Sequence, residues 1–97
     1  MNVLTLAHCE IRAGTRDGFL SDFVAYRSKV LAQEAGTLVF DVYESCHNEH
    51  RFTIEERFLN EEARQAHLAA DYHDEAVKRL HQYIEDGDAF FFVEQEA

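Results

Sequence analysis

The sequence contains no proline and no tryptophan, and only two of its 97 residues are cysteine. Two cysteines, Cys9 and Cys46, are too few for a disulfide framework, and neither lies in a recognisable nucleophile motif. The sequence also lacks the glycine pattern that cradles phosphates and the residue spacing that is typical of zinc sites. We therefore expect no metal and no tightly bound cofactor.

Lysine and arginine are scarce, since nine basic residues stand against 19 acidic ones and the formal net charge is −10. Nucleic acids and anionic membranes both require a basic surface, so we expect neither as a partner. The longest apolar run, residues 89–93, is far too short to span a bilayer, and the first residues lack the basic stretch of a signal peptide. These features predict a cytoplasmic protein, and the length predicts one domain, residues 1–97.

A regular alternation of side chains is present in residues 51–58. Phe52, Ile54, Glu56 and Phe58 share one face of this segment, which is the pattern of a half-buried strand. Glu56 is the charged member of this apolar face, and a buried carboxylate must be paired, hydrogen-bonded or protonated. Glu56 therefore either reaches water or an arginine near the end of the sheet, or lies inside a pocket.

Helices are predicted between the strands from their capping residues. Thr15 and Asn60 are suited to cap the helices that follow them, and Asp71 is suited to start a further helical piece. Gly36 is expected to end the first helix in a left-handed conformation, and Gly87 is expected to close the last one. The apolar stripe expected on the first helix consists of Leu20, Phe23, Val24, Arg27, Val30 and Leu31.

The expected order of elements is strand 3–12, a helix, strand 37–45, strand 51–58, a helical region in two pieces and strand 90–94. This β-α-β-β-α-β order predicts an α+β, ferredoxin-like fold, in which helices cover one face of a four-stranded antiparallel sheet. The other face should carry Leu4, Leu6, Val39, Tyr43, Phe91 and Val93, beside the polar residues His8, Asp41, Glu55 and Arg57. Such an apolar face must be covered, and a second copy of the chain is the simplest partner.

Histidine is the side chain best suited to proton transfer near neutral pH, and the sequence has six. His47 and His50 lie in the expected hairpin loop, and His73 and His81 are expected on a solvated helix face. His67 lies near the end of the helix that follows the third strand. It is either a general base or a residue that packs the helices together.

Residues 35–45, 51–58 and 66–68, in this order and spacing, resemble the antibiotic biosynthesis monooxygenase domain, and the resemblance covers essentially the whole chain. It implies a homodimer, a dimeric α/β barrel in which two ferredoxin-like sheets pack face to face. It also implies a pocket between each sheet and its own helices. In members that use no cofactor, an electron-rich phenol or quinol is deprotonated in this pocket, and its anion passes an electron to dioxygen.

The resemblance also suggests site residues. Glu56 matches the glutamate of the family's third strand and His67 matches its His-Leu pair, so either is expected to be the base, with Tyr72 orienting the substrate. The residues expected to bind the substrate are Phe40, Phe52, Phe58, Ala7 and Arg27. Phe58 stands where many members have tryptophan, and Ala7 stands roughly where some members have asparagine. Tyr72 falls near a position that is frequently histidine in the family.

Two other functions fit the same features. The base could move a proton within a small dicarbonyl metabolite, which would make the protein a cofactor-free isomerase. Alternatively, the fold could bind a small molecule without catalysis, as in a stress protein. A phosphorylated substrate would require cations, for which Arg27 and Arg57 are the candidates.

Overall fold

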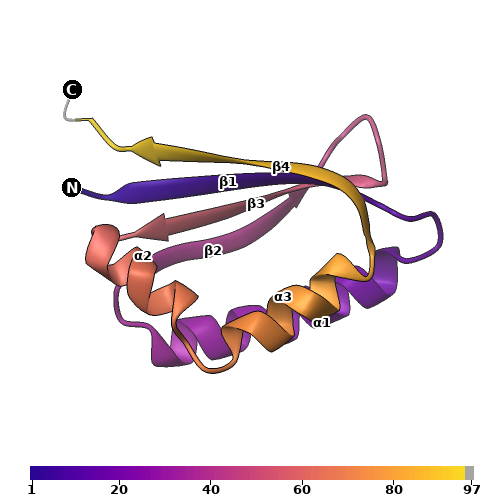
Figure 1. The fold of residues 1–97 in the computed structure, drawn as a ribbon. Coiled ribbons are helices and arrows are strands. Elements are labelled where there is room, and N and C mark those ends of the chain that lie inside the picture. The colour runs from indigo at the N-terminus through magenta and orange to yellow at the C-terminus, as the bar shows by residue number, and fades with distance from the viewer. Residues whose placement is uncertain (96–97) are drawn as a thin grey trace.

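The computed structural model describes residues 1–95 of the chain and shows a sheet with helices on one face only (Figure 1). The elements follow one another as β1 (Val3–Ile11), α1 (Arg16–Gln33), β2 (Thr37–Glu44), β3 (Arg51–Phe58), α2 (Glu61–Leu68), α3 (His73–His81) and β4 (Ile84–Val93). The strand pairings are antiparallel, and the order in the sheet is β2-β3-β1-β4. This arrangement confirms the predicted ferredoxin-like α+β fold, with the second helical region in two pieces.

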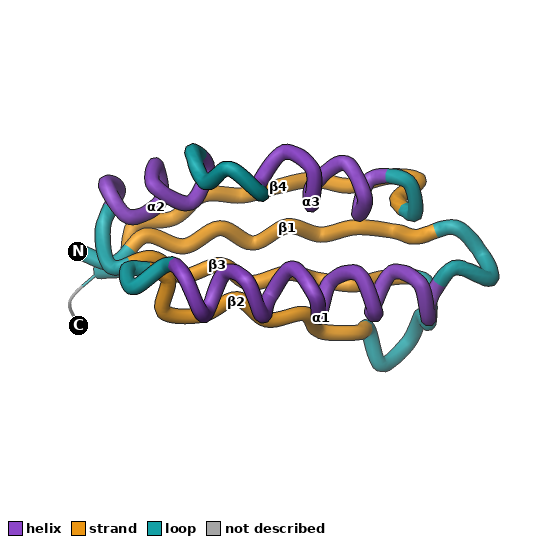
Figure 2. Tube along the Cα trace, turned by 90° about the horizontal axis from the view of Figure 1, so that it is seen from below, coloured by secondary structure: helices purple, strands orange, loops and turns teal. Residues whose placement is uncertain are grey.

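The helices form one layer against the sheet. Figure 2 shows α1 running along β2 and β3, while α2 and α3 follow one another on the side of β4. α1 contacts β2 and α3, and α3 contacts β4. None of the described helices combines the length and apolar character that a membrane crossing requires. The core therefore lies between the two helical rows and the sheet.

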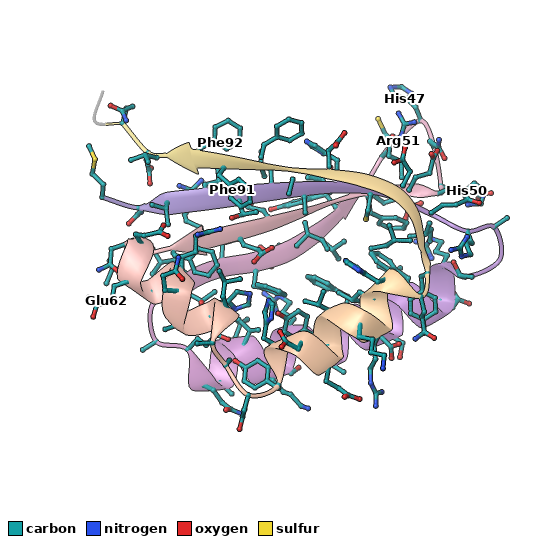
Figure 3. All side chains as sticks on the ribbon, in the orientation of Figure 1. His47, His50, Arg51, Glu62, Phe91 and Phe92 are labelled. Atoms are coloured by element: carbon teal, nitrogen blue, oxygen red, sulfur yellow. The ribbon has the colours of Figure 1, made fainter. Side chains whose placement is uncertain are left out.

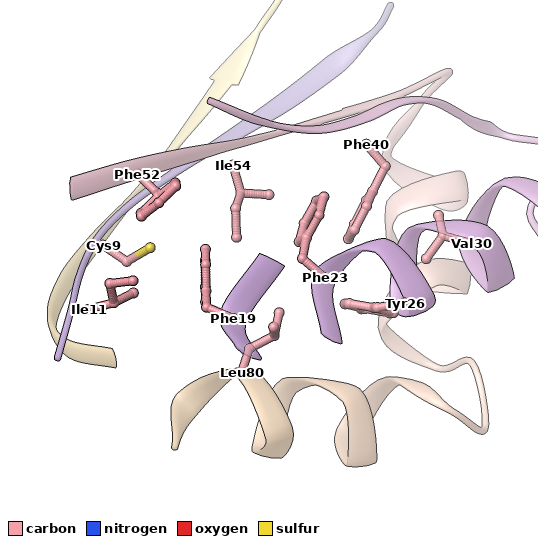
Figure 4. Close-up of a cluster of buried hydrophobic side chains, with 10 residues drawn as sticks. All are labelled: Cys9, Ile11, Phe19, Phe23, Tyr26, Val30, Phe40, Phe52, Ile54 and Leu80. Carbon is pink, nitrogen blue, oxygen red and sulfur yellow. The ribbon is translucent and has the colours of Figure 1, made fainter. Parts of the chain in front are cut away.

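The buried face of α1 consists of Phe19, Phe23, Tyr26 and Val30. The expected stripe was wrong in part, because Val24 and Leu31 are 59% and 42% exposed. α1 carries apolar side chains around much of its circumference, so the spacing in the sequence does not select one face. The large rings decide the orientation of the helix, since Phe19 and Phe23 pack against phenylalanines of the sheet (Figure 4).

Asn60 caps α2 as predicted, because its side-chain oxygen accepts a hydrogen bond from the amide of Ala63 at 2.8 Å. The prediction for Gly36 was wrong, since within residues 1–95 only Gly14 has a positive φ, of 81°. Gly36 is required for space instead, because a Cβ there would lie 2.6 Å from the Cβ of Ala63. Thr15 precedes α1, but its hydroxyl makes no capping hydrogen bond.

The last strand is longer than predicted. β4 begins at Ile84, and Gly87 lies within it rather than closing the preceding helix. A Cβ at Gly87 would lie 2.8 Å from the backbone oxygen of His8 in β1, so this close approach requires glycine. The polar residues of β4 join the strand because β1 supplies hydrogen-bonding partners along it. The start of α3 also differs, since Tyr72 and not Asp71 occupies its N-cap position.

The register between β1 and β4 decides which side chains face away from the helices. Phe90 and Phe92 pair with two leucines of β1 and share the outer face with them. The expectation that Phe91 and Val93 lie on this outer face was wrong, because both residues alternate with Phe92 along β4 and so lie on its helix side. Figure 3 shows Phe91 and Phe92 on opposite sides of the strand. On the helix side, an arginine of α2 lies 4.8 Å from the ring centroid of Phe91. The run is apolar at every position, so it carries no alternation from which its faces could be predicted.

Candidate functional site

His67 lies in the last turn of α2 and points into the core, where it is 2% exposed. Because Asn60 fixes the start of α2, the short helix presents His67 to the interior. The His67 ring packs against Phe58 and Phe40 of the sheet, at centroid distances of 5.3 and 5.5 Å. His73, which was expected on a solvated face, packs edge-on against the His67 ring at 5.2 Å.

Both ring nitrogens of His67 face acidic side chains. Nδ1 lies 2.8 Å from Oε1 of Glu34, and Nε2 lies 3.3 Å from Oε1 of Glu56. The hydroxyl of Tyr26 also lies 3.3 Å from Nε2, and the hydroxyl of Tyr72 donates to Oε2 of Glu34. We name these residues, Glu34, Glu56, His67, Tyr26 and Tyr72, the His67 cluster.

Glu34 reaches the cluster because α1 ends directly before it. Its backbone is extended, while its amide still donates to the carbonyl of Val30 in the last turn of α1. Its side chain is 10% exposed and accepts a further hydrogen bond, of 2.7 Å, from the hydroxyl of Thr37. One carboxylate therefore receives contacts from His67, Tyr72 and Thr37, and this network fixes its position.

The charge of the cluster depends on the protonation of His67. Burial by itself would lower the pKa of His67, but the hydrogen bonds and negative charges of Glu56 and Glu34 outweigh burial and raise the pKa above 6.5. The raised pKa favours the imidazolium form, which donates from both nitrogens to carboxylates. Burial and the nearby carboxylates also raise the pKa of Tyr26 and of Tyr72, so both tyrosines keep their protons at neutral pH.

The aromatic residues that were expected to bind a substrate lie in the core. Phe40, Phe52 and Phe58 are each 1–2% exposed. Phe40 and Phe58 contact His67, whereas Phe52 packs on Phe19 towards the other end of the core (Figure 4). These rings fill the space between the sheet and the helices around the cluster.

Ala7 and Arg27 lie apart from the cluster. Ala7 packs against the buried core from β1. The guanidinium of Arg27 binds the carboxylate of Asp41 and a carbonyl of β2, at 3.0 and 2.8 Å, at the exposed edge of the sheet. The structure thus brings together the candidates His67, Glu56, Tyr72, Phe40 and Phe58, and it places Phe52, Ala7 and Arg27 elsewhere.

Two members of the cluster, Tyr26 and Glu34, were not identified from the sequence. Tyr26 has a detectable signal, because it shares a helical stripe with the buried residues Phe19, Phe23 and Val30. Glu34 has none, since a glutamate just after a helix is typical of a solvated surface. Its role depends on side chains that the fold brings to it.

A groove of about 490 Å³ separates α1 from α3 and reaches the His67 cluster. Its lining includes Ala25, Tyr26, Lys29, Tyr72, Ala76 and Arg79. A smaller hollow of about 290 Å³ lies beside the end of α1 and includes Glu34 and Tyr72. Tyr72 borders both openings and is half-buried, whereas Tyr26 and His67 are buried. Within residues 1–95, no group of three or more acidic, histidine or cysteine side chains is placed to hold a metal ion.

Solved structures share this fold. A "putative antibiotic biosynthesis monooxygenase" from Caulobacter crescentus CB15 superimposes with a TM-score of 0.91 at 20% identity, over 98% of this chain and 91% of that chain. A conserved protein from Methanosarcina mazei Go1 superimposes with a TM-score of 0.90 at 16% identity, over 98% and 94% of the two chains. A "putative antibiotic biosynthesis monooxygenase" from Deinococcus radiodurans superimposes with a TM-score of 0.86 at 23% identity, over 98% of this chain and 94% of that chain.

At these identities the structures establish the fold alone, and no curated protein matches the sequence. The family is established by the sequence itself. The model of the family described as "Antibiotic biosynthesis monooxygenase" matches residues 3–79, which run from β1 into α3 and include every member of the His67 cluster. The chain therefore belongs to the antibiotic biosynthesis monooxygenase family.

Proposed function

We propose that the protein is a cofactor-independent monooxygenase that oxidises a small aromatic quinol or phenol with dioxygen. Membership of a family named for monooxygenases supports this proposal. The observation that carries it is the His67 cluster, because carboxylates in apolar surroundings are suited to accept a proton from a substrate, and an adjacent imidazolium is suited to stabilise the anion that forms. Phe40 and Phe58 pack against His67 and help to exclude water from the cluster.

The proposed reaction starts from the anion of the substrate. A quinol hydroxyl loses its proton to the cluster, and the electron-rich anion passes one electron to dioxygen. The substrate radical and superoxide then combine by forming a bond between a ring carbon and oxygen. Loss of water from the resulting peroxide gives a hydroxyquinone. One oxygen atom thus enters the ring, the other leaves as water, and no external reductant is consumed.

The carboxylates are the proposed proton acceptors within the cluster. His67 has a raised pKa because Glu56 and Glu34 outweigh its burial, and an imidazolium cannot accept a further proton. Glu34 or Glu56 then takes the proton from the substrate, while the positive charge of His67 stabilises the substrate anion. In this proposal His67 supplies charge rather than acting as the base.

An oxygen electrode tests the proposal with a panel of one-ring and two-ring quinols, each compared with its rate in buffer. We expect the glutamine variant of the accepting carboxylate, Glu34 or Glu56, to lower kcat by about 10²–10⁴-fold. Glu62→Gln is the matched control, because Glu62 lies on the exposed side of α2 and should leave kcat unchanged.

Two results would contradict the proposal. If oxygen uptake does not exceed the rate in buffer with any quinol, the proposed oxygenase activity is refuted. Conversion of a dicarbonyl compound under argon, with the same dependence on the cluster, would favour the isomerase that the sequence leaves open. Product analysis by mass spectrometry in ¹⁸O₂ gives an independent check, since one labelled oxygen atom should enter the product.

We also propose that the active form is a homodimer whose two sheets face each other. The outer face of the sheet carries exposed rings, with Phe90 and Phe92 at 47% and 48% exposure. The same face carries charges of both signs, since Arg57 lies 3.4 Å from Glu55, and Asp41 of β2 pairs with Glu55 across the strands. A twofold copy can therefore cover the rings and pair acids with the arginine, which makes the face self-complementary.

A further inference from the structure

The His67 cluster is open to solvent at Tyr72 but not at His67. His67 is 2% exposed and enclosed by the rings of Phe40 and Phe58, so a ligand cannot reach it from the sheet side in this structure. Tyr72, by contrast, is half-buried and lines the groove between α1 and α3. The hydroxyl of Tyr72 also donates a hydrogen bond to Glu34, and Glu34 is hydrogen-bonded to His67. Tyr72 thus connects the groove to the interior.

We infer that a planar aromatic compound of one or two rings binds in the groove between α1 and α3 and donates a hydroxyl hydrogen bond to the oxygen of Tyr72. The inference rests on the proposed function, whose substrate class it narrows and whose binding site it names. The groove, rather than the filled space between sheet and helices, then receives the substrate.

The shape of the groove suits such a ring. Its volume of about 490 Å³ lies in the range of small-molecule sites. Ala25 and Ala76 line it with methyl groups, so little side-chain volume obstructs a flat molecule. The rings of Tyr26 and Tyr72 both line the groove and meet edge to face, with centroids 6.2 Å apart, so they offer aromatic surface to a ligand.

The charges around the groove favour neither an anionic nor a cationic ligand. Two cations, Lys29 and Arg79, and three acids, Asp22, Asp71 and Glu75, line it. The acid groups are not all free, since Asp22 accepts a hydrogen bond from Tyr83 and Glu75 lies 3.8 Å from Arg79. With both signs present on its rim, the groove does not select a ligand by charge. Selection must come from the hydroxyl group of Tyr72.

The direction of the Tyr72 hydrogen bond specifies the ligand group. The hydroxyl hydrogen of Tyr72 is committed to Oε2 of Glu34, so its oxygen can only accept a hydrogen bond from the groove. A quinol or phenol supplies the required O–H donor, whereas a quinone or an ether supplies only acceptors. The site should therefore bind the reduced form of a quinone pair and release the oxidised form.

The same arrangement provides a path for the substrate proton. As the O–H bond of the ligand breaks, a new O–H bond forms on Tyr72, and the original proton of Tyr72 passes to Oε2 of Glu34. Burial and the hydrogen bond to Glu34 raise the pKa of Tyr72, so a free tyrosinate is unfavourable and the two transfers occur together. Charge is conserved, since the ligand becomes an anion and Glu34 becomes neutral.

Binding of 2-naphthol to ¹⁵N-labelled protein tests the site without requiring turnover. We expect amide shifts centred on Ala25, Lys29 and Ala76, and a dissociation constant that Tyr72→Phe raises by about three- to tenfold. The ether 2-methoxynaphthalene should bind more weakly than 2-naphthol to the wild type, and Tyr72→Phe should not change its affinity. Equal binding of the two compounds, or shifts confined to the sheet, would overturn the inference.

A blocked groove separates the site from the reaction. Ala25→Trp fills the groove from an exposed position, so we expect at least about tenfold weaker naphthol binding. Ala32→Trp, the same change at an exposed position two turns along α1, should bind as the wild type does. Quinol turnover that survives Ala25→Trp undiminished would refute the site and leave the proposed reaction standing. Naphthol binding in the groove without any quinol turnover would refute the reaction and support the site.

Discussion

Replacing Glu34 by glutamine tests whether His67 is held as an imidazolium between two carboxylates. The change keeps the shape of the side chain and one acceptor oxygen, but it removes one of the two negative charges that face His67. Because the pKa of His67 in the folded chain is raised above 6.5, folding binds its proton more tightly. The resulting stabilisation is fully present below the unfolded pKa and is lost as the pH rises through the folded pKa.

The magnitude follows from the contacts of Glu34. The Nδ1 atom of His67, at 2.8 Å, and the hydroxyl of Tyr72 both lose a charged acceptor that is only 10% exposed. A hydrogen bond to a charged group contributes about 1.5–3 kcal/mol, so we expect Glu34→Gln to lower the free energy of unfolding by about 2 kcal/mol at about pH 6. The contribution of His67 decreases as the pH rises through its folded pKa, so we expect a smaller loss at about pH 8.5 than at about pH 6.

Urea unfolding followed by circular dichroism at both pH values measures this difference. Comparing variant and wild type at each pH cancels the titration of groups that both proteins share. Glu62→Gln is the control, because Glu62 is exposed in the first turn of α2 (Figure 3) and its loss should cost less than about 0.5 kcal/mol at either pH. A loss of equal size at both pH values would refute the imidazolium interpretation.

Three further predictions concern stability and assembly. His67→Ala should lower the free energy of unfolding by about 3 kcal/mol in urea, because it leaves two carboxylates without their buried cation; unchanged stability would contradict this. Phe92→Glu should convert the proposed dimer to monomer in light scattering, whereas Phe91→Glu should not, and the reverse outcome would refute our assignment of the sheet faces. Gly36→Ala should lower Tm by roughly 5 °C in calorimetry, because its Cβ would overlap the Cβ of Ala63. Adding Ala63→Gly to this variant should restore much of the lost Tm, and no recovery would contradict the overlap.

The predictions for His67 and Phe91 differ from what the sequence alone suggests. From the sequence, removing His67 should reduce activity with little effect on stability if His67 is the general base, and a charge at Phe91 should disrupt the dimer. The structure changes the first expectation because His67 is almost fully buried between aromatic rings and two carboxylates. It changes the second because Phe91 faces α2 rather than the outer side of the sheet.

Short-range patterns in the sequence were sufficient for the order of elements and the fold class. The alternation in residues 51–58 predicted β3, and it also placed Glu56 on the side of the sheet that faces the helices. Asn60 predicted the start of α2, because a capping side chain bonds to an amide three residues along the same chain. Both features depend on neighbouring residues, which the sequence displays directly.

The rotation of α1, the start of β4 and the register of its phenylalanines required the tertiary structure. α1 has more apolar residues than one face can bury, and the fit of its rings against the sheet selects among them. β4 extends back to Ile84 through polar residues because β1 is there to pair with it. In each case the local sequence permits several arrangements, and packing against a distant segment selects one.

The His67 cluster is the clearest case of this division. The sequence indicated His67 and Glu56 from their types and positions, and Tyr72 through the family resemblance, but it gave no indication of Glu34. His67 and Glu34 are 33 residues apart in the chain, and Tyr72 and Glu34 are 38 apart. Only the folded chain brings these groups within hydrogen-bonding distance and excludes water from them, and their pKa values follow from that contact and burial.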